Sequence, residues 1–151
     1  MSATNLPDAA RSAVVRRAAH IRALGAAMVI ALLGQLVLGF ANTLWLAVPE
    51  TGSAWASAAP AALISAHMMV GVALVVLAVW IGRLAIRSRD RTWLAVTGVG
   101  VVGIVLGIAG GTIFMGDTTS NGASFLMAVG CTIALGAYAL GLYPVTSAAT
   151  D

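Results

Sequence analysis

Four long apolar runs, separated by short polar segments, set the pattern of this chain. We expect membrane-spanning helices at residues 23–46, 61–82, 93–115 and 122–143. Each run is close to the roughly 20 residues that an α-helix needs to cross a hydrocarbon core about 30 Å thick. A helix also satisfies its backbone hydrogen bonds internally, as the bilayer interior requires. The pattern predicts an all-α fold, an integral membrane four-helix bundle at residues 23–143, between terminal segments 1–22 and 144–151.

The basic residues indicate how such a bundle would be oriented. All eight are arginines that lie before the first run or between the second and third: Arg11, Arg16, Arg17, Arg22, Arg83, Arg87, Arg89 and Arg91. The other two loops between runs contain no Arg or Lys. Because short loops rich in Arg stay in the cytoplasm, we expect an up-down-up-down bundle with both termini cytoplasmic, in the plasma membrane of a prokaryote.

The arginine ends of the runs carry two further signals. Residues 11–22 are expected to continue the first helix beyond the membrane. Trp80, Trp93 and Tyr143 also lie at these ends, and amphipathic aromatic rings prefer the interface between lipid and water. We therefore expect these three residues to mark the interface at the arginine ends.

The composition supports a membrane protein and narrows its function. Sixty per cent of the residues are apolar and 9% are charged, against roughly half and a quarter in soluble domains. The excess of basic residues follows from the orientation, so we expect the lipid bilayer and no nucleic acid as the partner. No Asp or Glu lies within a run, and H-E-x-x-H and G-x-S-x-G motifs are absent. The sequence therefore argues against a carboxylate-coupled transporter and leans against an enzyme, with no catalytic residue predicted.

Polar side chains inside the runs gather near the ends opposite the arginines. Gln35 lies near the midplane of the first run, and Asn42, seven residues on, lies on the same face toward the outer leaflet. His67 lies just inside the outer end of the second run. At roughly 1.5 Å per residue, Asn42 and His67 come to a similar depth. Thr112 and Ser124 belong to the same layer. We predict an outer-leaflet polar pocket that contains Asn42, His67, Thr112 and Ser124.

His67 is the only Asp, Glu, Lys, Arg or His residue within a run, and intramembrane residues of these types usually have a function. In a first hypothesis, neutral His67 hydrogen-bonds Asn42, Gln35 or Ser124 and holds the helices together. In a second, it is an axial haem ligand, Gly71 leaves room for the macrocycle, and a methionine sulfur is the sixth ligand. The candidate sulfurs are those of Met68, Met69, Met115 and Met127. In a third, His67 contacts a quinone or relays protons.

Glycines recur along the third run. Gly103, Gly107 and Gly111 form two overlapping G-x-x-x-G units, a pattern typical of helices that approach closely in membranes. We expect this stripe to pack against another helix, within the chain or in a homo-oligomer, or to form a groove for a flat ligand. Gly107→Leu is expected to place a bulky side chain at the closest helix approach.

A pair of motifs in the first two runs resembles a known family. Gln35-x-x-x-Gly39, followed after a loop by His67-x-x-x-Gly71, is similar to the helix-pair unit of haem A synthases and of small four-helix membrane proteins with the same layout. The resemblance covers residues 34–80 and implies that His67 binds haem or substrate near the outer surface. The chain departs from the family at Phe125, where the last helix of such a unit carries a second histidine. Glu50 is the counterpart of an acidic residue in the family's first outer segment.

Two hypotheses for the whole protein follow. In the first, it is a small non-enzymatic membrane protein whose outer-leaflet pocket binds haem or another flat ligand, with Gln35, Gly71 and the methionines as further site residues. In the second, it is a structural or assembly subunit of a larger membrane complex, and the Gly-rich face of the third helix is the docking surface.

Overall fold

The computed structural model describes residues 8–45, 58–116 and 121–143, and these residues form four α-helices without a strand among them. The helices are α1 (Asp8–Trp45), α2 (Ala58–Ser88), α3 (Arg91–Gly116) and α4 (Asn121–Leu142). Each is long and apolar enough to cross a membrane. The all-α fold and the four candidate spans are therefore confirmed. Glu50 and the predicted tail at residues 144–151 lie outside the described residues.

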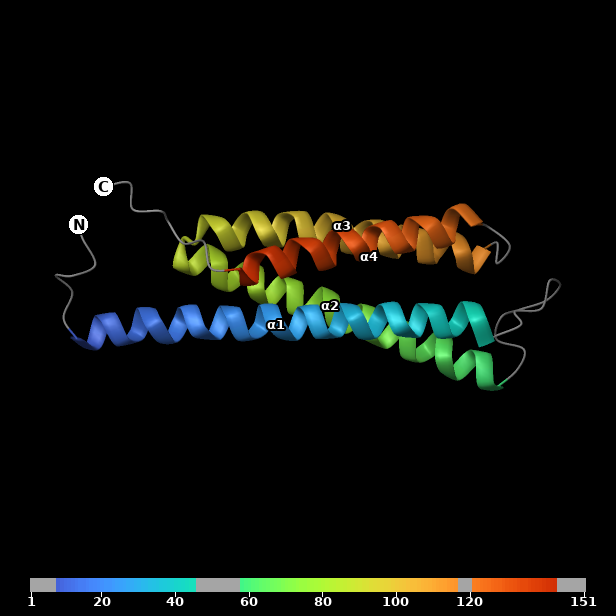
Figure 1. Cartoon of the computed structure of the whole chain (residues 1–151), viewed down its shortest axis with the longest axis horizontal. Helices are drawn as coiled ribbons and strands as arrows, with labels where there is room; N and C mark the ends of the chain where they lie inside the picture. The colour runs from blue at the N-terminus through green and yellow to red at the C-terminus, as the bar shows by residue number, and fades with distance from the viewer. Residues whose placement is uncertain (1–7, 46–57, 117–120, 144–151) are drawn as a thin grey trace.

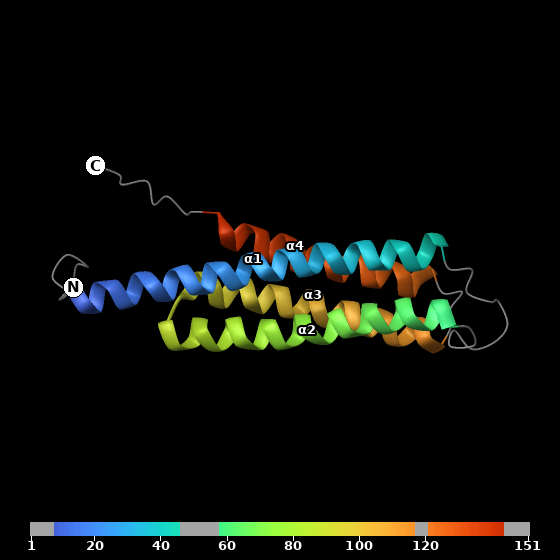
Figure 2. The same ribbon diagram turned by 90° about the horizontal axis from the view of Figure 1, so that it is seen from below.

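The helices lie side by side, and the longest projects past the others (Figures 1 and 2). The first residues of α1, the turn between α2 and α3, and the last residues of α4 lie at one end of the bundle. α1 has 38 residues, which is about 57 Å of helix against a hydrocarbon core of about 30 Å. Its first turns extend beyond that end of the bundle, as expected for residues 11–22.

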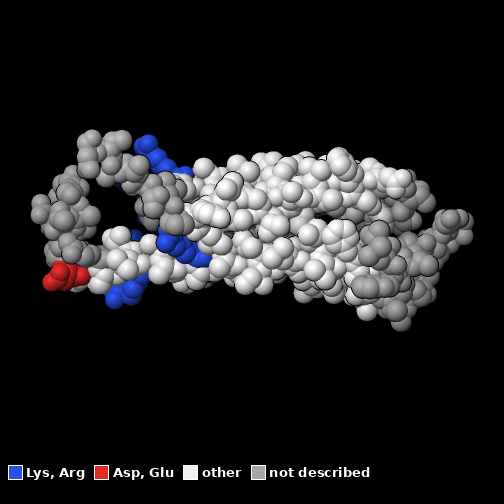
Figure 3. Space-filling view, viewed as in Figure 1, with Lys and Arg blue, Asp and Glu red and all other residues white. Residues whose placement is uncertain are grey.

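The described arginines gather at this same end (Figure 3), which we call the arginine end. The turn there is closed by local hydrogen bonds. The Asp90 amide donates to the Ala85 carbonyl at 3.1 Å and the Arg89 amide donates to the Ile86 carbonyl at 3.1 Å, the pattern of a Schellman motif. Arg89 has a φ of 53° in this motif. Asp90 then caps α3 by accepting a hydrogen bond from the Trp93 amide at 3.1 Å.

The closest contact between helices joins α3 to α4 through glycine. A Cβ added at Gly103 would lie 2.5 Å from the Gly130 carbonyl oxygen, and one added at Gly110 would lie 2.8 Å from that of Ala123. A Cβ at Gly107 would instead have open space around it. The backbone of Gly107 still lies at this contact, because a Cβ added at Gly130 would be 2.5 Å from its amide nitrogen. The expected stripe therefore packs on α4, but side chains at Gly103 and Gly110, not at Gly107, would meet the closest approach. Seven residues return a helix position almost to the same face, whereas four rotate it by about 40°.

The buried core connects all four helices and lies mainly between the arginine end and the middle of the bundle. Its largest fully buried side chains are Tyr138, Met28, Leu32 and Ile81. Two further glycines accommodate aromatic rings: Gly25 faces Trp93 and Gly100 faces Tyr138. Trp93, at the start of α3 near the arginine end, is only 4% exposed, so its ring packs inside the bundle. Trp80 and Tyr143, by contrast, are well exposed at 57% and 75%.

Candidate polar site between α1 and α2

The contact between α1 and α2 brings Gln35 and His67 together. Gln35 Nε2 lies 2.9 Å from His67 Nε2, within hydrogen-bonding distance. Gln35 lies in the second half of α1, and His67 in the first half of α2. The two residues are 32 positions apart in the sequence, so this bond fixes the depth of one helix against the other.

Two glycines make this contact possible, and their arrangement is reciprocal. A Cβ added at Gly39 would lie 3.7 Å from Cε1 of His67, and one added at Gly71 would lie 3.7 Å from Nε2 of Gln35. Each polar side chain therefore lies against the glycine that follows the other by four residues. The Gln35-x-x-x-Gly39 and His67-x-x-x-Gly71 patterns are thus two halves of one interhelical contact.

The hydrogen bond also assigns roles to the ring nitrogens of His67. With the Gln35 amide nitrogen as donor, His67 Nε2 accepts, so in the neutral imidazole the proton resides on Nδ1. His67 Nδ1 and Gln35 Oε1 are buried and have no hydrogen-bond partner. A buried polar atom without a partner costs about 1–3 kcal/mol, and the bilayer interior supplies no water to offset that cost.

Asn42 contributes a third such atom. It lies on the face of α1 that carries Gln35 and Gly39, and its Oδ1 is buried without a hydrogen-bond partner. Seven residues separate Asn42 from Gln35, which is about 10 Å along the helix axis. We call Gln35, Asn42 and His67 the polar cluster. It offers two amide oxygens as acceptors and one ring N–H as donor.

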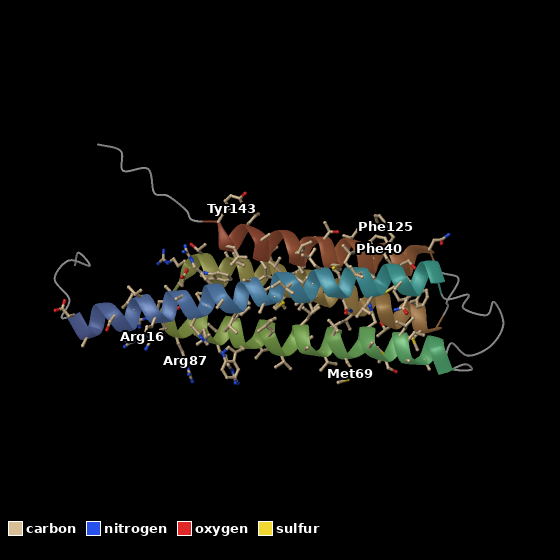
Figure 4. All side chains as sticks on the ribbon, turned by 60° about the horizontal axis from the view of Figure 1, so that its bottom comes forward. Arg16, Phe40, Met69, Arg87, Phe125 and Tyr143 are labelled. Atoms are coloured by element: carbon tan, nitrogen blue, oxygen red, sulfur yellow. The ribbon has the colours of Figure 1, made fainter. Side chains whose placement is uncertain are left out.

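The other residues of the expected outer pocket do not join this cluster. Thr112 is exposed, and its hydroxyl donates to the Ala109 carbonyl of its own helix at 2.8 Å. Ser124 is also exposed. Phe125 is 71% exposed and points outward from α4 (Figure 4). Among the described residues, the buried side-chain polar atoms without partners in this half of the bundle therefore come from α1 and α2.

The candidate methionine ligands lie elsewhere. Met68 and Met69 are 52% and 69% exposed, and Met69 points away from the bundle (Figure 4). Met115 is 40% exposed. Met127 is half-buried and packs on α3, where its Sδ would be 3.8 Å from a Cβ at Gly111. The structure therefore does not bring these sulfurs together with His67.

The contact between Gln35 and His67, as the structure shows it, does not leave His67 Nε2 or the space at Gly71 available to a haem. The Nε2 atom of His67 is engaged by Gln35, and Gly71, expected to leave room for a macrocycle, is covered by the Gln35 amide. Axial ligation by His67 would require the Gln35–His67 bond to break.

Three buried groups outside the cluster were not part of the predicted site. Cys131 Sγ on α4 lies 3.7 Å from the Leu32 carbonyl oxygen on α1, one helical turn before Gln35. The hydroxyl oxygens of Thr97 and Tyr138 are buried, and neither has a partner in hydrogen-bonding geometry. The sequence could have pointed to Thr97 and Tyr138, because the halves of their helices near the arginine end are otherwise apolar. Cys131 thus joins α4 to α1 close to the level of Gln35, whereas Thr97 and Tyr138 lie in the half of the bundle near the arginine end.

An apolar groove follows the same helix pair toward the arginine end. It has a volume of about 430 Å³ and is lined by Leu24, Ala73, Val76, Leu77 and Trp80. Ala73 follows His67 by six residues, which is about 9 Å along α2. The α1–α2 pair thus carries polar atoms at one depth and an open apolar surface further along.

Comparisons with protein-family models, with curated proteins and with solved structures find no match. The resemblance to haem A synthases therefore stays a prediction that depends on the motifs around Gln35 and His67.

Proposed function

We propose that this chain is a multi-pass membrane protein that binds a flat lipophilic molecule at the polar cluster of α1 and α2. The arrangement that we propose is up-down-up-down, in the plasma membrane of a prokaryote, with both termini cytoplasmic. The arginines at one end of the bundle support this orientation. The polar cluster would then lie in the outer leaflet.

The observation that carries the proposal is the set of unpaired buried atoms. Gln35 Oε1, Asn42 Oδ1 and His67 Nδ1 all lie on one helix pair, and none has a hydrogen-bond partner. A helix contact that served packing alone would be at least as stable with apolar side chains in these positions, because unpaired polar groups are costly when buried. A ligand that supplies the missing partners would recover this cost.

The packing of the bundle indicates which part can admit a ligand. α3 and α4 meet through backbone atoms at Gly103 and Gly130, which leaves no side chain between them. The α1–α2 contact at this level is made by the side chains of Gln35 and His67. Side chains can change rotamer, whereas a backbone contact cannot open without moving a helix. The polar cluster is therefore the more adaptable of the two contacts.

The contact between α3 and α4 also bears on the docking alternative. The face of α3 that carries Gly103 and Gly110 is covered by α4, so a partner protein would have to use another surface. The structural hypothesis that the contacts favour is instead a clamp between α1 and α2. A clamp and a ligand site differ in one respect: only the ligand site retains a molecule on purification.

Solvent extraction of the purified protein tests this proposal. The full chain would be isolated from its own membranes as the wild type, as His67→Ala, as Asn42→Leu, and as Thr112→Ala for a matched exposed control. Mass spectrometry of the extracts and an absorption spectrum of each sample would follow. We expect one lipophilic molecule to be retained by the wild type and by Thr112→Ala, and to be lost from the two cluster variants.

Two results would overturn the proposal or refine it. Extracts that are identical for all four folded proteins would show that the cluster binds nothing and is a clamp. A Soret band in the wild type that His67→Ala removes would identify the ligand as haem, and would show that the Gln35–His67 bond opens on binding.

A further inference from the structure

The hydrogen-bonding groups of the polar cluster define what its ligand must present. Gln35 Oε1 and Asn42 Oδ1 are amide oxygens and can only accept hydrogen bonds. His67 Nδ1 carries the ring proton when Nε2 accepts from Gln35, so it donates. A complementary ligand therefore provides two donors and at least one acceptor.

Two acceptors at different depths select between ligands that have such groups. Gln35 and Asn42 are seven residues apart on α1, which separates their Cα atoms by about 10 Å along the helix axis. One hydroxyl carries a single proton and donates to one oxygen, so the two acceptors require two hydroxyls. Two hydroxyls on opposite sides of a six-membered ring extend in the two required directions, and either oxygen of such a ring can accept from His67 Nδ1.

The ligand must also be uncharged. No Asp, Glu, Lys or Arg lies in α1 between Arg22 and the cluster, or in α2 before Arg83. An ion at this depth would lack a counter-ion, which is expensive in a bilayer. The apolar groove beside Ala73 and Trp80, on the same helix pair, suits a hydrocarbon tail.

Building on the proposed function, we infer that the polar cluster binds the headgroup of a lipid-soluble para-dihydroxybenzene, the reduced form of a quinone, in preference to the oxidised form. The two hydroxyls donate to Gln35 and Asn42, and one of their oxygens accepts from His67. The oxidised quinone has two carbonyl groups and no O–H. It satisfies His67 but leaves both amide oxygens unpaired. Each unpaired oxygen weakens binding by about five- to a hundredfold.

A series of stable ligands that lose one donor at a time tests this inference. The probes are 2-decyl-1,4-dihydroxybenzene, its monomethyl ethers, its dimethyl ether and 2-decyl-1,4-benzoquinone. Affinities would be measured by calorimetry with the full chain in phosphatidylcholine nanodiscs, and empty nanodiscs would correct for partition into lipid. We expect the dihydroxy compound to bind most tightly, each methylation to weaken binding at least fivefold, and the quinone to bind as weakly as the dimethyl ether.

Each methylation removes a hydrogen-bond donor and also adds bulk. Asn42→Leu separates the two effects and is the matched control for the added methyl group. This variant lacks one acceptor, so its affinity for the dihydroxy compound and for a monomethyl ether should become nearly equal. Thr112→Val should give the same series of affinities as the wild type. A series that is flat in the wild type, or a series that Asn42→Leu leaves unchanged, would overturn the inference. If the dihydroxy compound does not bind but the extract holds another molecule, the headgroup is wrong and the proposed function stands. If nothing binds and the extracts are empty, both are wrong.

Discussion

Gly103 and Gly107 are one helical turn apart on α3, yet alanine at these two positions should have opposite effects on stability. At Gly103, the new Cβ would lie 2.5 Å from the Gly130 carbonyl oxygen and 2.7 Å from the Ala134 amide nitrogen. Both neighbours are backbone atoms, so α3 and α4 would have to separate. At Gly107, the new Cβ would meet nothing within 4 Å.

The size of the effect follows from comparing the two variants. Gly→Ala within a helix gains about 0.5–1 kcal/mol from backbone entropy, and this gain applies to both positions. The difference between the variants therefore reports the packing cost alone. Overpacking of a close contact costs about 1–3 kcal/mol. We expect Gly103→Ala to be less stable than Gly107→Ala by that amount, and Gly107→Ala to be at least as stable as the wild type.

Unfolding of the purified chain in mixed micelles, by titration with dodecyl sulfate and detection by circular dichroism, measures this difference. Gly130→Ala should behave like Gly103→Ala, because its Cβ would lie 2.5 Å from the Gly103 carbonyl oxygen and from the Gly107 amide nitrogen. If Gly103→Ala and Gly107→Ala unfold within about 0.5 kcal/mol of each other, the α3–α4 contact is not as close as the structure places it. The expectation from sequence, that a bulky residue at Gly107 meets the closest approach, is reversed.

Three further predictions concern the other contacts. A double-mutant cycle with Gln35→Ala and His67→Ala should give a coupling of about 0.6 kcal/mol and at most about 1.7; zero coupling would mean that the 2.9 Å contact is not formed. Arg89→Gly should stabilise the chain by about 1 kcal/mol, since φ is 53° there and glycine adopts this conformation without strain; a loss of thermal stability would contradict this. Reporter fusions at residue 119 should be extracytoplasmic and fusions at residue 88 cytoplasmic, and the opposite result would reject the orientation.

The sequence predicted the helices well because their signal is long and repeated. Runs of about 20 apolar residues have few alternatives to a spanning helix, and the four candidate spans were confirmed. The faces of the helices were harder to predict. In a chain that is apolar all round, the hydrophobic pattern does not mark which side is buried. The direction of a side chain at Gly107 and the burial of Trp93 could not be predicted for this reason. Gly107 lies at the α3–α4 contact through its backbone, but a Cβ added there meets open space, and the Trp93 ring is buried.

The candidate site was predicted only in part. Asn42, His67, Thr112 and Ser124 were expected in one layer, with Gln35 near the midplane. In the structure His67 contacts Gln35, while Thr112 bonds to its own helix. Counting residues along each helix gives only an approximate depth. Direction depends on how four helices pack, which required the Gly103–Gly130 contact and the reciprocal glycines of α1 and α2.

The two helix pairs of this bundle are therefore built on different principles. α3 and α4 meet through backbone atoms at Gly103 and Gly130, where an added Cβ would lie 2.5 Å from the facing helix and would push the two apart. α1 and α2 leave a glycine opposite each polar side chain, so Gln35 and His67 occupy the space between the helices. Three side-chain atoms of this pair, on Gln35, Asn42 and His67, are buried without hydrogen-bond partners. The proposed ligand would therefore act on the pair whose contact is made by side chains, while the backbone contact of α3 and α4 stays unchanged.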